Sequence, residues 1–334
     1  MSDPRLTLAL QDAPLDEFAR IAVFGPPADA DLSALSAAQV AIVQPFKPDH
    51  DIWVARGFTA SPQLPESADA AIVFLPRAKA EARHLVATAL RLTCGGPVWI
   101  DGQKTDGIDS MLKPCRQRGQ VGNVISKAHG KCFDLHAEPA DFDDWIAGQT
   151  TLPSGHITAP GVFSADGVDP ASALLADALP DGLKGTAADF GAGWGFLSGA
   201  LMSKAPAITH LDLIEADHAS LECARRNVTD PRAAFHWADA TRPDPKARYD
   251  VIISNPPFHT SRAADPALGR AFLSAAARAL APSGQFWLVA NRHLPYERDL
   301  ATLFANVEER PGSPAFKLFV ARRPIGNPRA NAHK

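Results

Sequence analysis

The chain has 334 residues, of which 46% are hydrophobic and 21% charged, so it can bury a sizeable core and is long enough for two domains of ordinary size. The net charge of −4 argues against a protein that coats nucleic acid non-specifically, and no run of eighteen apolar residues offers a membrane span. The four cysteines form no CxxC pair and no histidine cluster lies near them, which excludes a disulfide scaffold or a zinc pattern. Because the amino terminus lacks the apolar core of a signal peptide, we expect a soluble, cytoplasmic protein.

In the first half, three segments have the character of strands. They are Asp69–Pro76 (DAAIVFLP), the end of Leu92–Asp101 (LTCGGPVWID) and Lys131–His136. A basic, alanine-rich segment after the first of them predicts a helix. A stretch rich in Pro, Gly and Thr, roughly 148–160, predicts a linker.

The second half alternates strand-like and helix-like segments, a pattern typical of a parallel sheet with crossover helices. The predicted strands are Thr186–Phe190, His210–Ile214, Ala233–Trp237, Tyr249–Ser254, Gln285–Ala290 and Phe316–Ala321. The predicted helices are Gly195–Lys204, Ser220–Asn227 and a segment near Gly269–Leu280. The last strand follows only a short connection, so we expect it to be antiparallel.

The two halves repeat one pattern. DAAIVFLP resembles YDVIISNP at 249–256, and LTCGGPVWID resembles LAPSGQFWLVA at 280–290, with Trp99 and Trp287 in matching places. We therefore predict two α/β domains of one ancestry, with boundaries at 1–150 and 151–334.

Positive charge is unevenly distributed. Residues 77–131 contain ten Lys and Arg against four Asp and Glu, and residues 310–334 contain six against none. Two such segments are suited to flank an anionic substrate such as RNA, although similar runs are also common on ordinary helices and tails.

A glycine motif, Asp189-Phe-Gly191-Ala-Gly193-Trp-Gly195, lies between a predicted strand and a predicted helix. Glycines there let the backbone pass close to a ligand. The pattern is DxGxGxG rather than the dinucleotide pattern GxGxxG. Asp189 suits the ammonium group of S-adenosylmethionine (SAM) and would repel a pyrophosphate, so the motif favours SAM. Glycine turns also occur for purely structural reasons.

Two further acids follow predicted strands. Glu215, 20 residues past Gly195, is placed to accept both ribose hydroxyls, as acids do in other nucleoside-binding doubly wound folds. Asp239 is placed to accept from the adenine amine, although an ordinary helix cap or turn residue fits its position equally well.

The segment Ser254-Asn255-Pro256-Pro257-Phe258-His259 follows the predicted strand ending at Ser254. Two prolines stiffen a turn at the edge of the sheet where open α/β folds bind ligands. An exocyclic base amine is a poor nucleophile until its N–H bonds are drawn out of the ring plane, and the Asn255 side-chain oxygen and Pro256 carbonyl are paired acceptors for that task. Phe258 is placed to stack on a base.

The ordered set PGVFSADGVD (160–169), DFGAGWG, LIEAD, ISNPPFH and VANRHLPY resembles the bacterial ribosomal RNA small subunit methyltransferase C family, which makes N2-methylguanosine in 16S RNA. The large-subunit methyltransferase G is a close relative of that family. The resemblance extends over both halves and implies two tandem Rossmann-like domains of the SAM-methyltransferase type, the first of them degenerate. PRAKAEARHL at 76–85 resembles a segment characteristic of that first domain.

The resemblance also implies roles for individual residues. Asn255 and Phe258 match the family's NPPF motif, and Glu215 matches its ribose acid. Asp189, Gly191, Gly193 and Gly195 match its glycine loop, and Asn255 is expected to border the cofactor as well. Trp194 departs from the family, in which small or aliphatic residues are more usual. In the first half, Leu75 stands where the repeat would need Asn255, and Gly25-Pro26-Pro27 replaces the glycine motif, so we expect no SAM there and a role in fold support or RNA docking.

The predicted function is methylation by SAM of the N2 amine of a guanine in ribosomal RNA, with 16S RNA as the expected target, by a monomer that needs neither metal nor membrane. An N6-adenine methyltransferase acting on RNA or DNA is the nearest alternative, because NPPF serves both amines. A protein glutamine methyltransferase and a non-catalytic RNA-binding relic are two others. The first usually has NPPY and a helical amino-terminal domain, and the intact Asn255 and glycines argue against the second.

Overall fold

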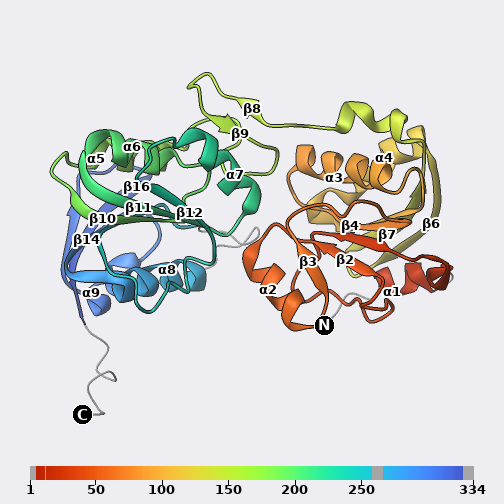
Figure 1. Ribbon diagram of the computed structural model, residues 1–334, viewed down its shortest axis with the longest axis horizontal. Coiled ribbons are helices and arrows are strands. Elements are labelled where there is room, and N and C mark those ends of the chain that lie inside the picture. Colours follow the sequence, from red (N-terminus) through yellow and green to blue (C-terminus); the bar gives the residue numbers. More distant parts are fainter. Residues whose placement is uncertain (1–4, 12, 258–265, 326–334) are drawn as a thin grey trace, which may run out of the picture. The chain divides into compact units, whose positions relative to one another are not determined.

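The computed structural model describes residues 5–11, 13–257 and 266–325, and the chain divides into two compact units (Figure 1). The N-terminal unit is Met1–Thr150 with Ala159–Gly161, and the C-terminal unit is Thr151–Thr158 with Val162–Lys334. Both are α/β domains with largely parallel sheets, which confirms the predicted fold class. Among the described residues, no helix has the length and apolar character needed to cross a membrane.

The N-terminal unit contains a seven-stranded sheet of order β3-β2-β1-β4-β5-β7-β6, parallel except at β7 and β6. Its strands are β1 (Ile21–Phe24), β2 (Val40–Val43), β3 (Thr59–Ser61), β4 (Ala70–Phe74), β5 (Val98–Gln103), β6 (Gln120–Lys127) and β7 (Gly130–His136). Its α-helices are α1 (Arg5–Leu10), α2 (Lys47–Ala55), α3 (Lys79–Leu92) and α4 (Ile108–Arg118), and its short 3-10 helices are η1 (Leu15–Glu17), η2 (Lys104–Asp106) and η3 (Pro139–Trp145).

The C-terminal unit repeats this topology with the order β12-β11-β10-β13-β14-β16-β15. Its strands are β10 (Lys184–Phe190), β11 (Ala207–Glu215), β12 (Ala233–Trp237), β13 (Tyr249–Ser254), β14 (Leu280–Asn291), β15 (Phe304–Arg310) and β16 (Phe316–Pro324). Its helices are α5 (Pro170–Ala178), α6 (Phe196–Lys204), α7 (His218–Asn227), α8 (Pro266–Ala279) and α9 (Tyr296–Leu303). A small pair of strands, β8 (Thr150–Thr151) and β9 (Ile157–Thr158), lies in the predicted linker.

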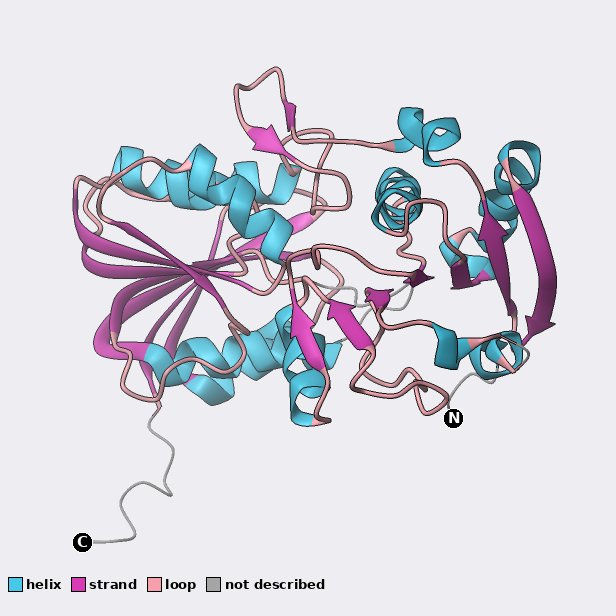
Figure 2. Cartoon of the chain, turned by 45° about the vertical axis from the view of Figure 1, so that its right-hand side comes forward, coloured by secondary structure: helices cyan, strands magenta, loops and turns pink. Residues whose placement is uncertain are grey.

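Helices cover both faces of the C-terminal sheet, as Figure 2 shows. One apolar cluster joins α5, α6 and α7 to the sheet face that carries Val251, Ile253 and Trp287. Another joins α8 and α9 to the opposite face, which carries Ile252 and Phe286. Because successive strand residues point to opposite faces, these nearly continuous apolar runs are what a sheet covered on both sides requires.

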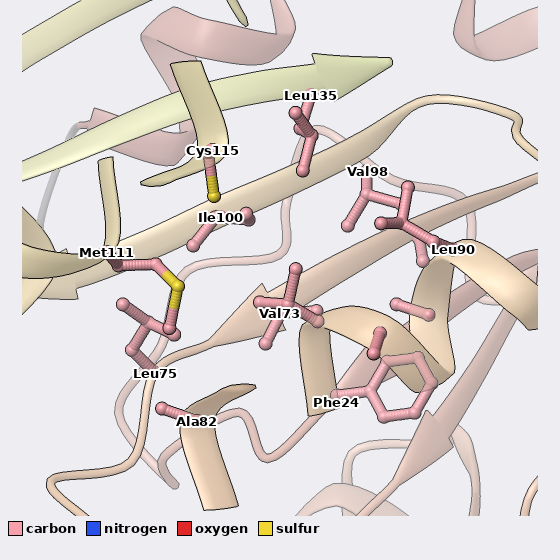
Figure 3. Close-up of a cluster of buried hydrophobic side chains, with 14 of the residues drawn as sticks. Phe24, Val73, Leu75, Ala82, Leu90, Val98, Ile100, Met111, Cys115 and Leu135 are labelled. Carbon is pink, nitrogen blue, oxygen red and sulfur yellow. The ribbon is translucent and has the colours of Figure 1, made fainter. Parts of the chain in front are cut away.

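The N-terminal unit is built on the same plan. Its α3 and α4 cover one sheet face, where Val73, Ile100 and Leu135 meet Leu90 and Cys115 (Figure 3). The opposite face packs against α1 and α2.

The repeat is confirmed by the matching strand orders and by the two tryptophans. Trp99 on β5 lies beside Ile72 on β4, and Trp287 on β14 lies beside Ile253 on β13. This register makes Phe74 the counterpart of Asn255, so the expectation that Leu75 occupies that place is wrong by one residue. A shift of one residue moves a side chain to the other face of a strand. The apolar residues of DAAIVFLP do not by themselves fix the register of the repeat.

Candidate active site

The glycine motif forms the turn that joins β10 to α6. Gly191, Gly193 and Gly195 all have positive φ angles, of 76°, 54° and 88°. Gly191 donates its backbone N–H to the Ile214 carbonyl, which holds the turn against β11. A Cβ on Gly195 would lie 2.8 Å from Val228 Cγ2, so α7 can pack against the turn only because this residue is glycine.

Glu215 ends β11, and its carboxylate ties the glycine turn to the start of α7. Its Oε2 accepts from the Gly193 backbone N–H at 2.7 Å, and its Oε1 accepts from the Asp217 N–H at 2.8 Å. Burial raises the pKa of Glu215 to about 7, although the backbone N–H groups that donate to its carboxylate, that of Asp217 among them, act in the opposite direction. Each carboxylate oxygen can accept a second hydrogen bond, so both remain available to hydroxyl donors.

Asp189 lies at the end of β10 with its side chain completely buried. Its Oδ2 accepts from Ser198 Oγ at 2.7 Å, whereas its Oδ1 has no hydrogen-bond partner in the described part of the chain. Burial raises its pKa to about 7, and Glu215 adds to the rise. The site therefore contains two carboxyl groups that raise each other's affinity for a proton, and one oxygen, Asp189 Oδ1, accepts no hydrogen bond from the described residues.

Asn255 follows β13, with the backbone fixed by Ser254, whose buried hydroxyl donates to the Phe190 carbonyl at 2.7 Å. The Asn255 Nδ2 donates to Asp169 Oδ2 and to Ser172 Oγ, at 2.9 Å each. Its Oδ1 is buried and accepts no hydrogen bond from the described residues. Buried polar atoms are nearly always hydrogen-bonded, so the unpartnered Oδ1 of Asn255 marks it as a candidate acceptor for a ligand.

Asp169 and Ser172 were assigned no role from the sequence. Asp169 is the N-cap of α5, and its Oδ2 also accepts from the Ser172 backbone N–H at 2.8 Å. An aspartate followed by proline and an alanine-rich run is a signal for a helix start. That signal does not reveal that the same carboxylate reaches Asn255, 86 residues away in the sequence.

A cavity that is open to solvent brings several of these residues together. Its lining combines the glycine turn, the start of α5 and the end of β13 and includes Asp169, Ser172, Gly191, Gly193 and Asn255. Asp189, Gly195 and Glu215 do not line it, but they support the turn that does. The cavity thus lies at the carboxyl edge of the sheet, beside the free acceptor of Asn255.

Trp194 closes one side of this cavity. Its Nε1 donates to the Phe163 carbonyl at 2.9 Å, and its ring lies 5.1 Å from that of His156. Asn227 donates to the carbonyls of Trp194 and Ile157. The indole therefore anchors the segment before α5, which carries the 59% exposed Phe163 to the cavity.

The remaining predicted site residues lie as follows. Asp239, after β12, accepts from the Thr241 N–H and hydroxyl, at 2.9 and 2.6 Å, which makes it part of a local turn. Pro256 is buried beside Asn255. Phe258 lies outside the described residues. The adenine contact of Asp239, the acceptor role of the Pro256 carbonyl and the stacking role of Phe258 stay predictions.

The N-terminal unit keeps the form of this site with other side chains. Strand register makes Val23 the counterpart of Asp189 and Gln44 the counterpart of Glu215. Gln44 accepts from the Phe46 N–H, as Glu215 does from Asp217, but it donates to the carbonyl of Pro26. An amide thus fills the place of the carboxylate, and of the glycine turn only the first glycine is kept, as Gly25, followed by Pro26 and Pro27.

Comparison with known proteins identifies both units. The family model described as Methyltransferase small domain matches residues 155–320, and that described as Methyltransferase small domain N-terminal matches residues 16–147. A protein of Psychromonas ingrahamii named ribosomal RNA small subunit methyltransferase C is 31% identical over 278 residues, 78% of each chain. A protein of the same name from Shewanella piezotolerans is 32% identical over 276 residues, 77% of this chain and 78% of the relative.

A solved structure gives the same answer. The T. thermophilus 16S ribosomal RNA N2 G1207 methyltransferase, in complex with AdoMet and guanosine, has a TM-score of 0.79 and 26% sequence identity, and the match covers 96% of this chain and 92% of that one. Since the matches span both units, the protein belongs to the ribosomal RNA small subunit methyltransferase C family.

Proposed function

We propose that the protein methylates the exocyclic N2 amine of a guanine in 16S ribosomal RNA, with SAM as the methyl donor. Its relatives are named as methyltransferases of the small-subunit ribosomal RNA. The structural relative is an N2 guanine methyltransferase in complex with AdoMet and guanosine. The observation in this chain that carries the proposal is the free, buried Oδ1 of Asn255 at the edge of the cavity.

The polar groups beside the glycine turn, next to the cavity, fit SAM. The free Oδ1 of Asp189 suits the ammonium group, and the Glu215 carboxylate beside the glycine turn suits the ribose hydroxyls. When bound, SAM supplies an electrophilic methyl group on a sulfonium. Gly193, with space around its Cα, lets a ligand approach the backbone closely.

Asn255 acts on the nucleophile. Its Oδ1 accepts a hydrogen bond from the guanine N2 amine, with the Pro256 carbonyl as the second acceptor, and this draws the amine lone pair out of conjugation with the ring. The methylated amine is acidic and loses its proton readily, so no strong general base is required. Most of the rate enhancement then comes from positioning the two reactants.

The substrate determines where and how the enzyme acts. A 16S RNA target implies action in the cytoplasm, and light scattering of the purified protein would test the expected monomeric state. Whether naked RNA or the assembled small ribosomal particle is the substrate is decided by offering both to the purified enzyme.

The test is mass spectrometry of nucleosides from 16S RNA and small ribosomal particles treated with the enzyme and labelled SAM. We expect N2-methylguanosine from the wild type and at least 100-fold slower formation by Asn255→Ala, with unchanged SAM affinity. N6-methyladenosine as the product would contradict the proposal, as would wild-type turnover by Asn255→Ala. Loss of the same nucleoside from the ribosomal RNA of a deletion strain would identify the target in the cell.

A further inference from the structure

The Asn255 side chain is held by the first turn of α5. Asp169, the N-cap residue, and Ser172, one turn later, each accept one hydrogen bond from the Asn255 Nδ2. Asp169 and Ser172 are themselves joined, because Asp169 Oδ2 accepts from the Ser172 backbone N–H. Both N–H bonds of the amide are therefore used within the protein.

This arrangement fixes the orientation of the amide. A carboxylate only accepts hydrogen bonds, so the nitrogen and not the oxygen of Asn255 must face Asp169. In the flipped orientation, two oxygens would meet at Asp169, and the NH₂ group would face the position of the free Oδ1. An exocyclic amine is itself a donor, and a second donor would repel it.

We propose that Asp169 is a positioning residue for methyl transfer, which keeps the Asn255 Oδ1 as the acceptor for the target amine. Ser172 supports it through the second N–H. This inference rests on the proposed function and adds to it a residue that acts through Asn255 rather than on the substrate or SAM.

The helix that carries Asp169 is firmly placed. Ala171 and Leu175 of α5 are buried in the apolar cluster that also contains Leu201 of α6 and Val289 of β14. Ser172 is 7% exposed. The acceptors for the Asn255 amide are thus packed onto the sheet that carries Asn255. The negative charge of Asp169 also strengthens its hydrogen bond, because charge-assisted hydrogen bonds exceed neutral ones in strength.

Three variants separate positioning from support of the helix. Asp169→Ala removes the acceptor and the helix cap together. Asp169→Asn keeps a capping oxygen that can also accept from Asn255, but it removes the charge. Ser172→Ala keeps the cap and removes only the second acceptor. Asp217→Ala removes an equivalent aspartate cap, from α7, and provides a reference melting temperature for that loss alone.

Each variant is assayed as the full-length enzyme on small ribosomal particles, with kcat at saturating SAM, SAM affinity by calorimetry and a melting curve. Loss of a charge-assisted hydrogen bond predicts a kcat about 10- to 100-fold lower for Asp169→Ala. We expect a loss of about 3- to 10-fold for Ser172→Ala, and a kcat for Asp169→Asn between those of Asp169→Ala and the wild type. SAM affinity should stay within about twofold of wild type in all three.

The decisive measurement is a double-mutant cycle in single turnovers. If Asp169 acts through Asn255, the variant Asp169→Ala/Asn255→Ala reacts no more slowly than Asn255→Ala alone. Additive losses would overturn the proposal, and so would wild-type kcat in Asp169→Ala. Weaker SAM binding with unchanged kcat at saturation would instead make Asp169 a cofactor ligand. Failure of the proposed function would be recognised separately from failure of this inference, because the wild-type enzyme itself would then form no N2-methylguanosine.

Discussion

Asp189 and Glu215 are carboxyl groups whose burial raises each pKa to about 7. The ordinary values are 3.8 and 4.5, so between about pH 4 and 7 the folded chain holds protons that the unfolded chain has released. Stability from these two groups is therefore greatest at low pH and is lost as the pH rises through 7. We expect SAM to reverse this trend, because its ammonium and hydroxyl groups would favour the ionised carboxylates, so its affinity should rise between pH 6 and 8.

Asp189→Asn should make the unliganded protein more stable and the cofactor complex weaker. The asparagine still accepts from Ser198 but carries no buried charge, so we expect a gain on the order of 2 kcal/mol at pH 8 and a much smaller gain at pH 5. Melting curves at both pH values and SAM calorimetry test this. Asp177→Asn, the same change at an exposed residue of α5, is the control and should leave both quantities unchanged. A less stable Asp189→Asn at pH 8 would refute the argument.

At the scale of elements, the turn between β10 and α6 depends on the absence of a Cβ at Gly195. Alanine there would need a left-handed φ near 88° and would press on Val228 and Ala224 of α7. We expect Gly195→Ala to lower the stability by about 2–4 kcal/mol and to abolish SAM binding.

Gly199, inside α6, gives a matched control. A Cβ at Gly199 meets no atom within 4 Å, so Gly199→Ala should raise the stability by about 0.5–1 kcal/mol and leave SAM binding intact. Denaturant unfolding of both variants measures the difference. Equal effects of the two substitutions would mean that the turn does not need its glycine.

The sequence predicted the elements of the C-terminal unit better than those of the N-terminal unit. The predicted strands of the second half are all present, because each has a run of apolar residues and a clear boundary. The strands β1, β2 and β3 were missed because they have only three or four residues each, and a short apolar run does not distinguish strand from helix. The edge strand β15 was missed because it is mostly exposed, so it has little hydrophobic pattern.

The site was predictable to the extent that it is local in sequence. The glycine turn, Glu215 and Asn255 each follow a strand, and that pattern predicts them as candidate site residues. The contacts of Asn255 with Asp169 and Ser172, and of Trp194 with Phe163, join residues that are far apart in the chain. Such contacts depend on how α5 packs on the sheet, which periodicity does not reveal.

At the scale of the whole molecule, the two copies of one fold carry different side chains at corresponding positions, and we expect only the C-terminal unit to bind SAM. Gln44 stands where the C-terminal unit has Glu215, and its side chain donates to the carbonyl of Pro26. We expect calorimetry of the full chain to give one SAM per chain, with affinity about 10- to 100-fold weaker in Glu215→Gln. Gln44→Glu is the matched reverse change and should create no second site, because Val23 and the prolines remain. Two SAM molecules per wild-type chain would contradict the assignment.

The basic segment at residues 77–131 is less cationic than its composition suggests. Three of its positive groups form ion pairs within the N-terminal unit: Arg91 with Asp143, Arg118 with Asp144, and Lys131 with Asp109. The Arg83 guanidinium lies over the ring of Trp145. Arg77 and Lys79 are exposed and form no ion pair with any described residue. They follow β4, at the edge of the sheet where the other copy has Asn255. This edge is the best candidate for the RNA-docking surface.

Reversing Arg77 and Lys79 together to glutamate should therefore weaken RNA binding without changing SAM affinity. Phosphate contacts release counterions, so losing two of them should reduce the slope of log affinity against log salt by roughly 1.5. Lys113→Glu with Arg116→Glu makes the same change of charge at exposed positions of α4, and it should alter the slope much less if docking is confined to the β4 edge. Affinity across a salt series, with melting curves, distinguishes the outcomes. Equal effects of the two pairs would indicate a general electrostatic attraction, and an unchanged slope in a folded Arg77→Glu/Lys79→Glu variant would remove this edge from the RNA-binding surface.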